Sequence, residues 1–108
     1  MSGLTREDRI RNLLGMAQKA GRIASGNTGV EKAVKEKRAT YILVAGDASP
    51  ESRKGYEEMA TRYGIPCSIS MTKAELGASI GREYRAAVAL TDEGFGRSLA
   101  KLMGEGKN

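Results

Sequence analysis

The stretch SGNTGVEKAVKEKRATYILVAGD, residues 25–47, contains a glycine-bounded turn, a basic amphipathic segment and an apolar run. Thr28 and Glu31 have the spacing of a capping box, which predicts a helix that continues to about Lys37. The run TYILVAG at 40–46 is rich in β-branched residues and lacks polar alternation. This pattern is typical of a strand covered on both faces, so the stretch predicts a helix followed by a buried strand.

The rest of the chain repeats this alternation of helix and strand. Capping residues and glycine stops predict helices over about residues 6–20, 28–37, 49–63, 72–81 and 92–103, and the apolar runs predict strands over 22–25, 40–46, 65–70 and 86–91. Such alternation predicts a three-layer α/β/α sandwich with a small mixed sheet of about four strands. The length of 108 residues predicts a single domain over residues 1–108.

The predicted helices have apolar faces, and the first and third of them are examples. The residues expected to face inward are Ile10, Leu13, Leu14, Ala17 and Ala20 in the first helix, and Tyr56, Met59, Ala60 and Tyr63 in the third.

The composition disfavours several classes of protein. The chain has no histidine and a single cysteine, Cys67, which we expect to be a packed thiol because no histidine can activate it. Without histidine, the usual acid–base relays and the commonest metal ligand are missing, so we expect no enzyme, no metal site and no cofactor. The charged start does not resemble a signal peptide and no apolar run is long enough to span a bilayer, so we expect a cytoplasmic protein.

The positive charge is concentrated in the first third of the chain. Residues 1–38 contain nine Lys or Arg residues and four Asp or Glu residues, an excess that equals the net charge of +5 of the whole chain. A localised positive field attracts phosphate backbones or other anionic surfaces. A well-solvated surface has a similar composition, and charge alone does not separate these two interpretations.

The glycine-bounded turn is the first candidate for a ligand site. Gly26 and Gly29 frame Asn27 and Thr28 in the G-x-x-G pattern of KH domains, although the same glycines suit a simple tight turn. The free N–H groups at the start of the predicted helix form an anion site, and Asn27 and Thr28 can hydrogen-bond phosphates or base edges. Lys32, four residues after the predicted cap, is expected near the same end, where a cation is locally unfavourable and therefore suggests a ligand.

Other patterns carry weaker signals. The segment GRIASGNT at 21–28 has the glycine spacing of a phosphate-binding loop, but asparagine occupies the position of the essential lysine, so an NTPase is disfavoured. The segment GREYR at 81–85 places Arg82, Tyr84 and Arg85 in the loop before the last strand, which suits RNA stacking and phosphate contact as well as an ordinary solvated loop. Acidic residues at the strand-to-helix turns suit helix starts better than a magnesium site; these are Asp47, Glu51, Asp92 and Glu93.

Six segments between residues 9 and 103 read NLLGMAQKAGRIASG, VEKAV, YILVAGDASP, YGIPCSI, ELGASIG and AVALTD. In this order and spacing they resemble the ribosomal L7Ae/L30e family, and in particular its bacterial RNA-binding members. The resemblance implies an α/β/α sandwich and recognition of kink-turn RNA, which is a sharply bent duplex with tandem sheared G·A pairs.

The resemblance also implies site residues. In the kink-turn binders of the family, the helix after the first strand begins with Gly, a small residue, Asn, Glu, two further residues and Lys. Gly26 and Lys32 match this pattern, whereas Thr28 and Gly29 occupy the positions of the Asn and Glu that contact the G·A guanines. The second RNA-contacting loop of the family corresponds to residues 82–86. The predicted RNA-binding residues are therefore Gly26, Asn27, Thr28, Gly29, Lys32, Lys35, Arg82, Tyr84 and Arg85.

From these observations we expect a non-catalytic RNA-binding protein, monomeric when free and associated with the ribosome or another structured RNA. The alternative is a protein–protein adaptor of the same fold that uses the surface near Tyr56 and Tyr63, with an incidental basic face. A steep fall of RNA affinity with salt would favour the first interpretation, because phosphate contacts release counterions.

Overall fold

The computed structural model describes residues 3–104, in which helices and strands alternate as the sequence predicts. The helices are α1 (Arg6–Lys19), α2 (Gly26–Lys35), α3 (Pro50–Tyr63), α4 (Lys73–Ser79) and α5 (Glu93–Leu102), and the strands are β1 (Ile23–Ser25), β2 (Tyr41–Val44), β3 (Cys67–Ile69) and β4 (Ala87–Leu90). The expected helices and strands are therefore confirmed, with shorter strands than the apolar runs suggested.

The four strands form one sheet in the order β1-β4-β2-β3. The strand β4 pairs antiparallel with both β1 and β2, whereas β2 and β3 run parallel. The predicted mixed sheet is confirmed. Its register places Ser25, the last residue of β1, opposite Val88 near the start of β4. The end of β1 and the beginning of β4 are thus neighbours.

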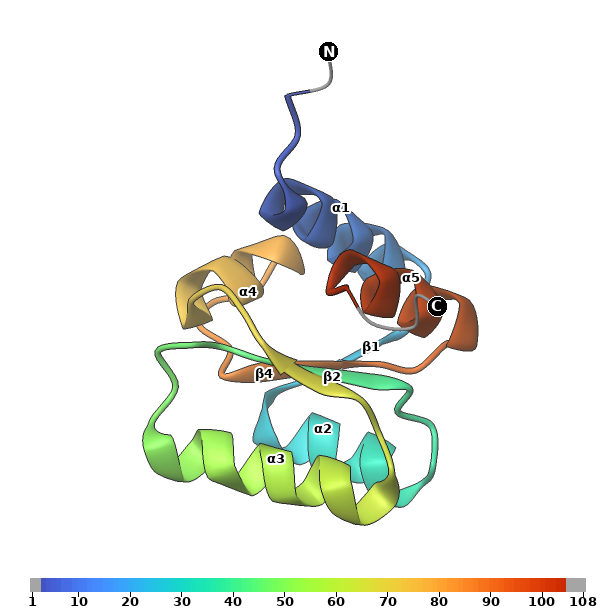
Figure 1. The fold of residues 1–108 in the computed structure, drawn as a ribbon, viewed down its shortest axis with the longest axis vertical. Helices are drawn as coiled ribbons and strands as arrows, with labels where there is room; N and C mark the ends of the chain where they lie inside the picture. The colour runs from blue at the N-terminus through green and yellow to red at the C-terminus, as the bar shows by residue number, and fades with distance from the viewer. Residues whose placement is uncertain (1–2, 105–108) are drawn as a thin grey trace.

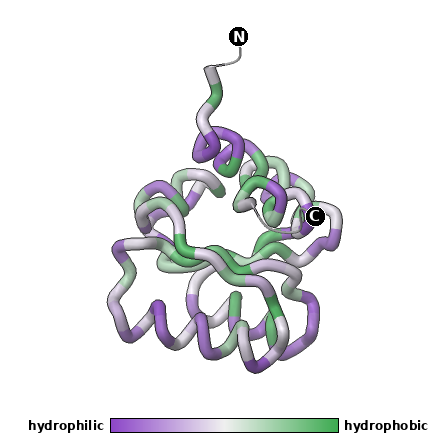
Figure 2. Tube along the Cα trace, viewed as in Figure 1, coloured by the Kyte–Doolittle hydropathy of each residue, from purple (hydrophilic) through white to green (hydrophobic). Residues whose placement is uncertain are grey.

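Helices cover both faces of this sheet. Figure 1 shows α1, α4 and α5 on one face and α2 and α3 on the other, which confirms the three-layer sandwich. Every residue of β2 and β4 is buried, while β1 and β3 at the edges are partly exposed. Burial on both faces explains why the central strands are continuous apolar runs. Figure 2 shows the same arrangement, with hydrophobic strands in the middle and hydrophilic residues along the outer helices.

Side chains cap most of the helix starts as expected. Thr5 and Asp8 form a reciprocal capping box at α1, and Thr72 and Glu75 form another at α4. The hydrogen bond from the Thr5 backbone N–H, followed by the one from the Arg11 guanidinium at 2.6 Å, lowers the pKa of Asp8 below its ordinary value. Single side-chain caps start the other two capped helices, at Ser49 in α3 and Asp92 in α5.

The capping box predicted at Thr28 is wrong. The helix α2 begins at Gly26, directly after β1, so Thr28 lies within its first turn. Gly26 has a φ of +78°, which glycine adopts readily, and this lets the chain pass from strand to helix without a linker. Glu31 does not reach back to a cap and instead pairs with Lys35.

Lys32 does not lie at the start of its helix, where the sequence places it. Lys32 lies in the last turn of α2, where the helix dipole favours a cation, rather than near the positive end. Its location is therefore not locally unfavourable and does not by itself suggest a ligand.

Two of the expected inward-facing residues are exposed. Ala20 follows the end of α1, and Tyr63 at the end of α3 is 39% exposed. The remaining members of these faces are buried or partly buried against the sheet. None of the helices within residues 3–104 has the length and apolar character needed to cross a bilayer.

Candidate nucleic-acid interface

The start of α2 presents uncapped backbone N–H groups. Ser25 occupies the N-cap position in an extended conformation, but its side chain makes no capping hydrogen bond. The first N–H groups of a helix have no partner within the helix, so those of Gly26, Asn27 and Thr28 are available to an external acceptor. The side chains of Asn27 and Thr28 are exposed beside them. This end of α2 can therefore accept an anion, as the sequence predicts for a helix start.

Arg85 joins the start of α2 to the loop before β4. Its Nε donates a hydrogen bond to Ser25 Oγ at 3.3 Å, and its Nη1 donates to the carbonyl of Tyr84 at 2.9 Å. A surface hollow lies where the two segments meet, and its lining residues are Ser25, Gly26, Asn27, Thr28, Gly29, Tyr84, Arg85 and Ala86. The structure thus brings together the two segments that the sequence marked separately. We call residues 25–29 and 82–86 together the turn–loop surface.

The loop of residues 82–86 rests on α4. The backbone N–H of Arg82 donates to the carbonyl of Gly77 at 2.8 Å, and that of Arg85 donates to the carbonyl of Lys73 at 3.1 Å. Gly77 is buried, and a Cβ at this position would lie 1.5 Å from the carbonyl oxygen of Glu83. Only a residue without a side chain allows this approach. Gly77 therefore sets the position of the loop.

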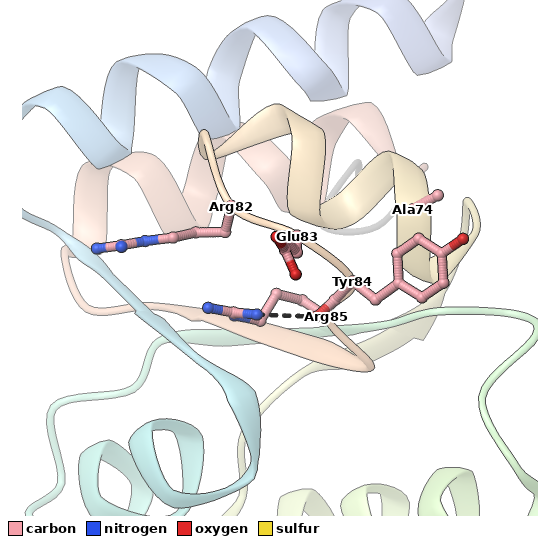
Figure 3. A pocket seen from close by; sticks show the side chains of 5 residues that line it. All are labelled: Ala74, Arg82, Glu83, Tyr84 and Arg85. Atoms are coloured by element: carbon pink, nitrogen blue, oxygen red, sulfur yellow. Dashed lines mark hydrogen bonds between the residues drawn. The ribbon is translucent and has the colours of Figure 1, made fainter.

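The two arginines of the loop extend to the same side. In Figure 3, Arg82 and Arg85 extend in the same direction, whereas Tyr84 points the opposite way, next to Ala74. Neither arginine has a carboxylate partner within residues 3–104. Arg85 therefore adds a positive charge without an ion-pair partner next to the start of α2, and Arg82 adds another in the same loop. Tyr84, which is 70% exposed, lines one hollow together with Arg82 and Arg85, although its ring points away from the two guanidinium groups.

The two lysines of α2 occupy different positions relative to this surface. Lys32 is exposed and follows Thr28 by four residues, which places both on one face of the helix. Because helical side chains lean toward the N-terminus, the Lys32 ammonium group can approach the turn. Lys35 lies about 14 Å along the helix from Gly26. Its Nζ pairs with Glu31 at 3.0 Å, which raises the pKa of Lys35. The structure therefore separates Lys35 from the other predicted site residues.

A sequence model of the ribosomal protein L7Ae/L30e/S12e/Gadd45 family matches residues 8–100. The chain belongs to this family. It is similar to an RNA-binding protein YlxQ from Bacillus subtilis, with 37% identity over 91 residues that cover 84% of this chain and 91% of that protein. It is also 36% identical over 83 residues to a large ribosomal subunit protein eL30 from Aeropyrum pernix, covering 75% of this chain and 83% of that protein.

Solved structures show the same fold. A structure described as that of a protein with unknown function from Bacillus halodurans C is 32% identical and superposes with a TM-score of 0.83, covering 88% of this chain and 96% of that chain. The 15.5kD RNA binding protein of Giardia lamblia superposes with a TM-score of 0.79 at 19% identity, covering 96% of this chain and 89% of that chain. The fold is thus retained where little sequence similarity remains.

In this L7Ae/L30e family member, a residue of α3 contacts the turn, which the sequence did not indicate. The hydroxyl of Tyr56 donates a hydrogen bond to Asn27 Oδ1 at 2.9 Å, across 29 positions of the chain. Tyr56 is only 4% exposed. It therefore does not belong to an exposed surface that a protein–protein adaptor could use, contrary to the expectation. A buried tyrosine hydroxyl needs a partner, so the expected burial of Tyr56 is the signal that could have indicated a contact outside α3.

The acidic residues at the strand-to-helix turns of this family member stabilise helices. Asp47 Oδ1 accepts a hydrogen bond from the backbone N–H of Lys73 at 2.8 Å, so it caps α4 from a neighbouring loop. Asp92 Oδ2 accepts from the N–H of Phe95 at 3.0 Å and caps α5. Among residues 3–104 no group of three or more His, Cys, Asp or Glu side chains could hold a metal ion.

Proposed function

We propose that this protein binds structured RNA without catalysing a reaction, and that it does so through the turn–loop surface. The observation that carries the proposal is the bond between Arg85 and Ser25, which joins two segments 60 positions apart in the chain into one surface. Arg85, which has no carboxylate partner among the described residues, then lies beside the uncapped N–H groups of α2, and Arg82 lies in the same loop. Arginine side chains and helix N-termini are among the groups that contact phosphate oxygens in nucleic-acid complexes. The names of the relatives, an RNA-binding protein and a ribosomal protein, support the same interpretation.

The proposed RNA is bent or otherwise structured, with a kink-turn as the model ligand. Thr28 offers one rotatable hydroxyl and Gly29 offers no side chain at the positions where kink-turn binders of the family carry Asn and Glu. Lys32 tolerates many acceptor positions because its charge sits on a flexible stem. We therefore propose a preference for kink-turn RNA over plain duplex that is weaker than a kink-turn specialist shows.

A competition titration tests the site. The probes are a kink-turn RNA and the same RNA with its G·A pairs replaced by Watson–Crick pairs. Replacing Arg82 and Arg85 by alanine should weaken binding to both RNAs and reduce the slope of log affinity against log salt by about 1 to 2, since two phosphate contacts are lost. The control is the Arg6→Ala/Arg9→Ala variant, which removes the same charge from the exposed face of α1. Equal losses in both variants would show that only bulk charge attracts RNA.

The double variant Thr28→Asn/Gly29→Glu tests specificity. It should sharpen the preference for the kink-turn RNA, because each good base contact contributes about 1–3 kcal/mol of discrimination. A shift in preference of less than twofold would show that these two positions do not face the bases.

We also propose that the protein acts in the cytoplasm on ribosomes, as a monomer when free. Relatives named as large ribosomal subunit proteins support this part of the proposal. Sedimentation of lysates should place the protein in ribosomal-subunit fractions at low salt and release it at high salt. Sedimentation only at the top of the gradient at low salt would contradict ribosome association while leaving RNA binding open to the titration above.

A further inference from the structure

The helix α2 ends with a lysine where a glycine is usual. The backbone N–H of Lys37 donates to the carbonyl of Val34 at 3.0 Å, and that of Arg38 donates to the carbonyl of Ala33 at 2.9 Å, which is the pattern of a Schellman motif. The residue that closes this motif has a positive φ, which favours glycine because a Cβ is crowded there. Lys37 occupies this position with a φ of +61°. The other four helices within residues 3–104 are followed by a glycine with a positive φ; these are Gly21, Gly64, Gly81 and Gly104.

No contact within residues 3–104 compensates for the strained backbone of Lys37. Its side chain is exposed and forms no hydrogen bond or ion pair with another described residue. The dipole of α2 does not require it either, because Lys32 and Lys35 already lie in the last turn of this helix. A residue that breaks a local rule without a gain inside the protein is best explained by a contact outside it.

Lys37 lies at the end of the sheet where β4 finishes. The carbonyl of Arg22 accepts a hydrogen bond from the Thr91 N–H at 3.0 Å, and the Thr40 N–H donates to the carbonyl of Leu90 at 2.7 Å. The segments that precede β1 and β2 therefore flank the end of β4, about 10 Å apart across two strand spacings. Figure 1 shows both connections at the right-hand end of the sheet.

Three cations at this end of the sheet lack carboxylate partners. Lys19 lies in the last turn of α1 and Arg22 follows it by three residues; like Lys37, both are exposed and form no ion pair with a described residue. The carboxylates of the same end are already engaged; they are those of Glu36 with Arg38, of Glu93 with Arg97, and of Asp92 as the cap of α5. We call Lys19, Arg22 and Lys37 the second basic surface.

The second basic surface is separated from the turn–loop surface by the length of β4. Arg85 precedes this strand and Thr91 follows it, so the two surfaces lie about 20 Å apart in an extended chain of six residues. One phosphate group cannot contact both. Neither residues 19–22 nor residues 36–38 contain an exposed large apolar side chain, so these segments do not supply the apolar core of a protein interface. Exposed cations of this kind suit a phosphate backbone.

We propose that the second basic surface holds the phosphates of a second RNA segment while the turn–loop surface holds the first, so that the protein joins two segments of a structured RNA. This inference rests on the proposed RNA-binding function. Attraction to phosphates does not depend on sequence, so the second segment can be an ordinary duplex. The contact also explains why α2 ends with a lysine instead of a glycine.

A capture experiment tests this inference. Kink-turn RNA on beads is saturated with protein, washed and offered a fluorescent duplex that contains only Watson–Crick pairs. The wild-type complex should retain the duplex at low salt and release it as the salt concentration rises. The Lys19→Ala/Arg22→Ala/Lys37→Gly variant should bind the duplex at least about fivefold more weakly in this assay, because three phosphate contacts are lost.

Two further variants separate the contact from bulk charge and from misfolding. Arg6→Ala/Arg9→Ala/Lys54→Ala removes the same charge from exposed residues of α1 and α3 and should still capture the duplex. Both triple variants should bind the kink-turn RNA itself equally well. Lys37→Gly alone should raise the urea midpoint, since glycine adopts a positive φ readily, and should nevertheless weaken capture.

The outcomes distinguish this inference from the proposed function. Wild-type complexes that retain no duplex, or the two triple variants capturing it equally, would overturn the inference and leave RNA binding by the turn–loop surface intact. Capture that polyglutamate abolishes as effectively as unlabelled duplex would overturn the assignment to RNA in favour of an acidic protein. Failure of the wild type to bind the kink-turn RNA in a salt-dependent way would overturn the proposed function itself.

Discussion

Replacing Gly77 with alanine tests whether α4 sets the position of the loop at residues 82–86. The added Cβ would lie 1.5 Å from the carbonyl oxygen of Glu83, 2.5 Å from its carbonyl carbon and 3.1 Å from the carbonyl oxygen of Arg82. These atoms belong to the backbone, so a side-chain rotation cannot relieve the overlap. The loop has to move away from the helix.

Three terms set the expected size of this effect. Overpacking of a buried position costs about 1–3 kcal/mol. Moving the loop also weakens the 2.8 Å hydrogen bond from Arg82 to the Gly77 carbonyl, at a cost of about 1 kcal/mol. Alanine in place of glycine in a helix recovers about 1 kcal/mol. We therefore expect Gly77→Ala to lower the free energy of unfolding by about 1–3 kcal/mol, or several degrees in Tm.

The assay combines urea denaturation with titration of the kink-turn RNA. Gly55→Ala is the matched control, because no atom lies within 4 Å of a Cβ at this position of α3. That variant should gain up to about 1 kcal/mol, as an exposed helical glycine does on replacement. In Gly77→Ala the displaced arginines should also weaken RNA binding. A Gly77→Ala protein as stable as wild type, with unchanged RNA affinity, would refute the claim that α4 and the loop are in direct backbone contact.

Three other predictions concern charge and capping. Lys32→Ala should weaken RNA binding more than reversal of Arg6 and Arg9 to glutamate, because Lys32 shares a helix face with the turn; a titration in which the reversal is more damaging would contradict this. Asp47→Ala should lower the free energy of unfolding by about 0.5–2 kcal/mol in denaturation experiments, because it leaves the Lys73 N–H at the start of α4 without its acceptor while the Thr72–Glu75 capping box remains. Asp8→Asn should destabilise the protein at neutral pH. Because the native pKa of Asp8 lies below the usual value of about 3.9, the stability difference from wild type should be complete above that pH and vanish as the solution is acidified through the native pKa; a difference that is constant with pH would refute it.

Most of the helices and strands could be predicted from short sequence patterns. The capping boxes at Thr5 and Thr72 involve only residues three positions apart, so their spacing along the chain correctly indicates where α1 and α4 begin. The Thr28 and Glu31 pair has the same spacing but does not cap, because Gly26 already turns the chain into the helix and Glu31 pairs with Lys35. The spacing of Thr28 and Glu31 is compatible with a helix that begins at either residue 26 or residue 28, so it does not determine the start of α2.

The site was harder to predict because its contacts are not local. Arg82 and Arg85 were recognised as a basic loop, but the sequence does not give the direction in which their side chains point. The bond between Tyr56 and Asn27 spans 29 positions, and the approach of Gly77 to Glu83 depends on how α4 packs. Such contacts follow from the arrangement of layers, which periodicity alone does not determine.

The position of β4 between β1 and β2 has a consequence for the synthesis of this protein. In the sheet, β1 has no neighbour other than β4, so it stays unpaired until the last strand has been made. At a translation rate of about 5–20 residues per second, Arg85 follows Ser25 by about 3–12 s. During this interval the two segments of the turn–loop surface are not yet joined. If this surface binds RNA as proposed, capture begins only after the ribosome has synthesised β4, and binding is a late event in the maturation of the chain.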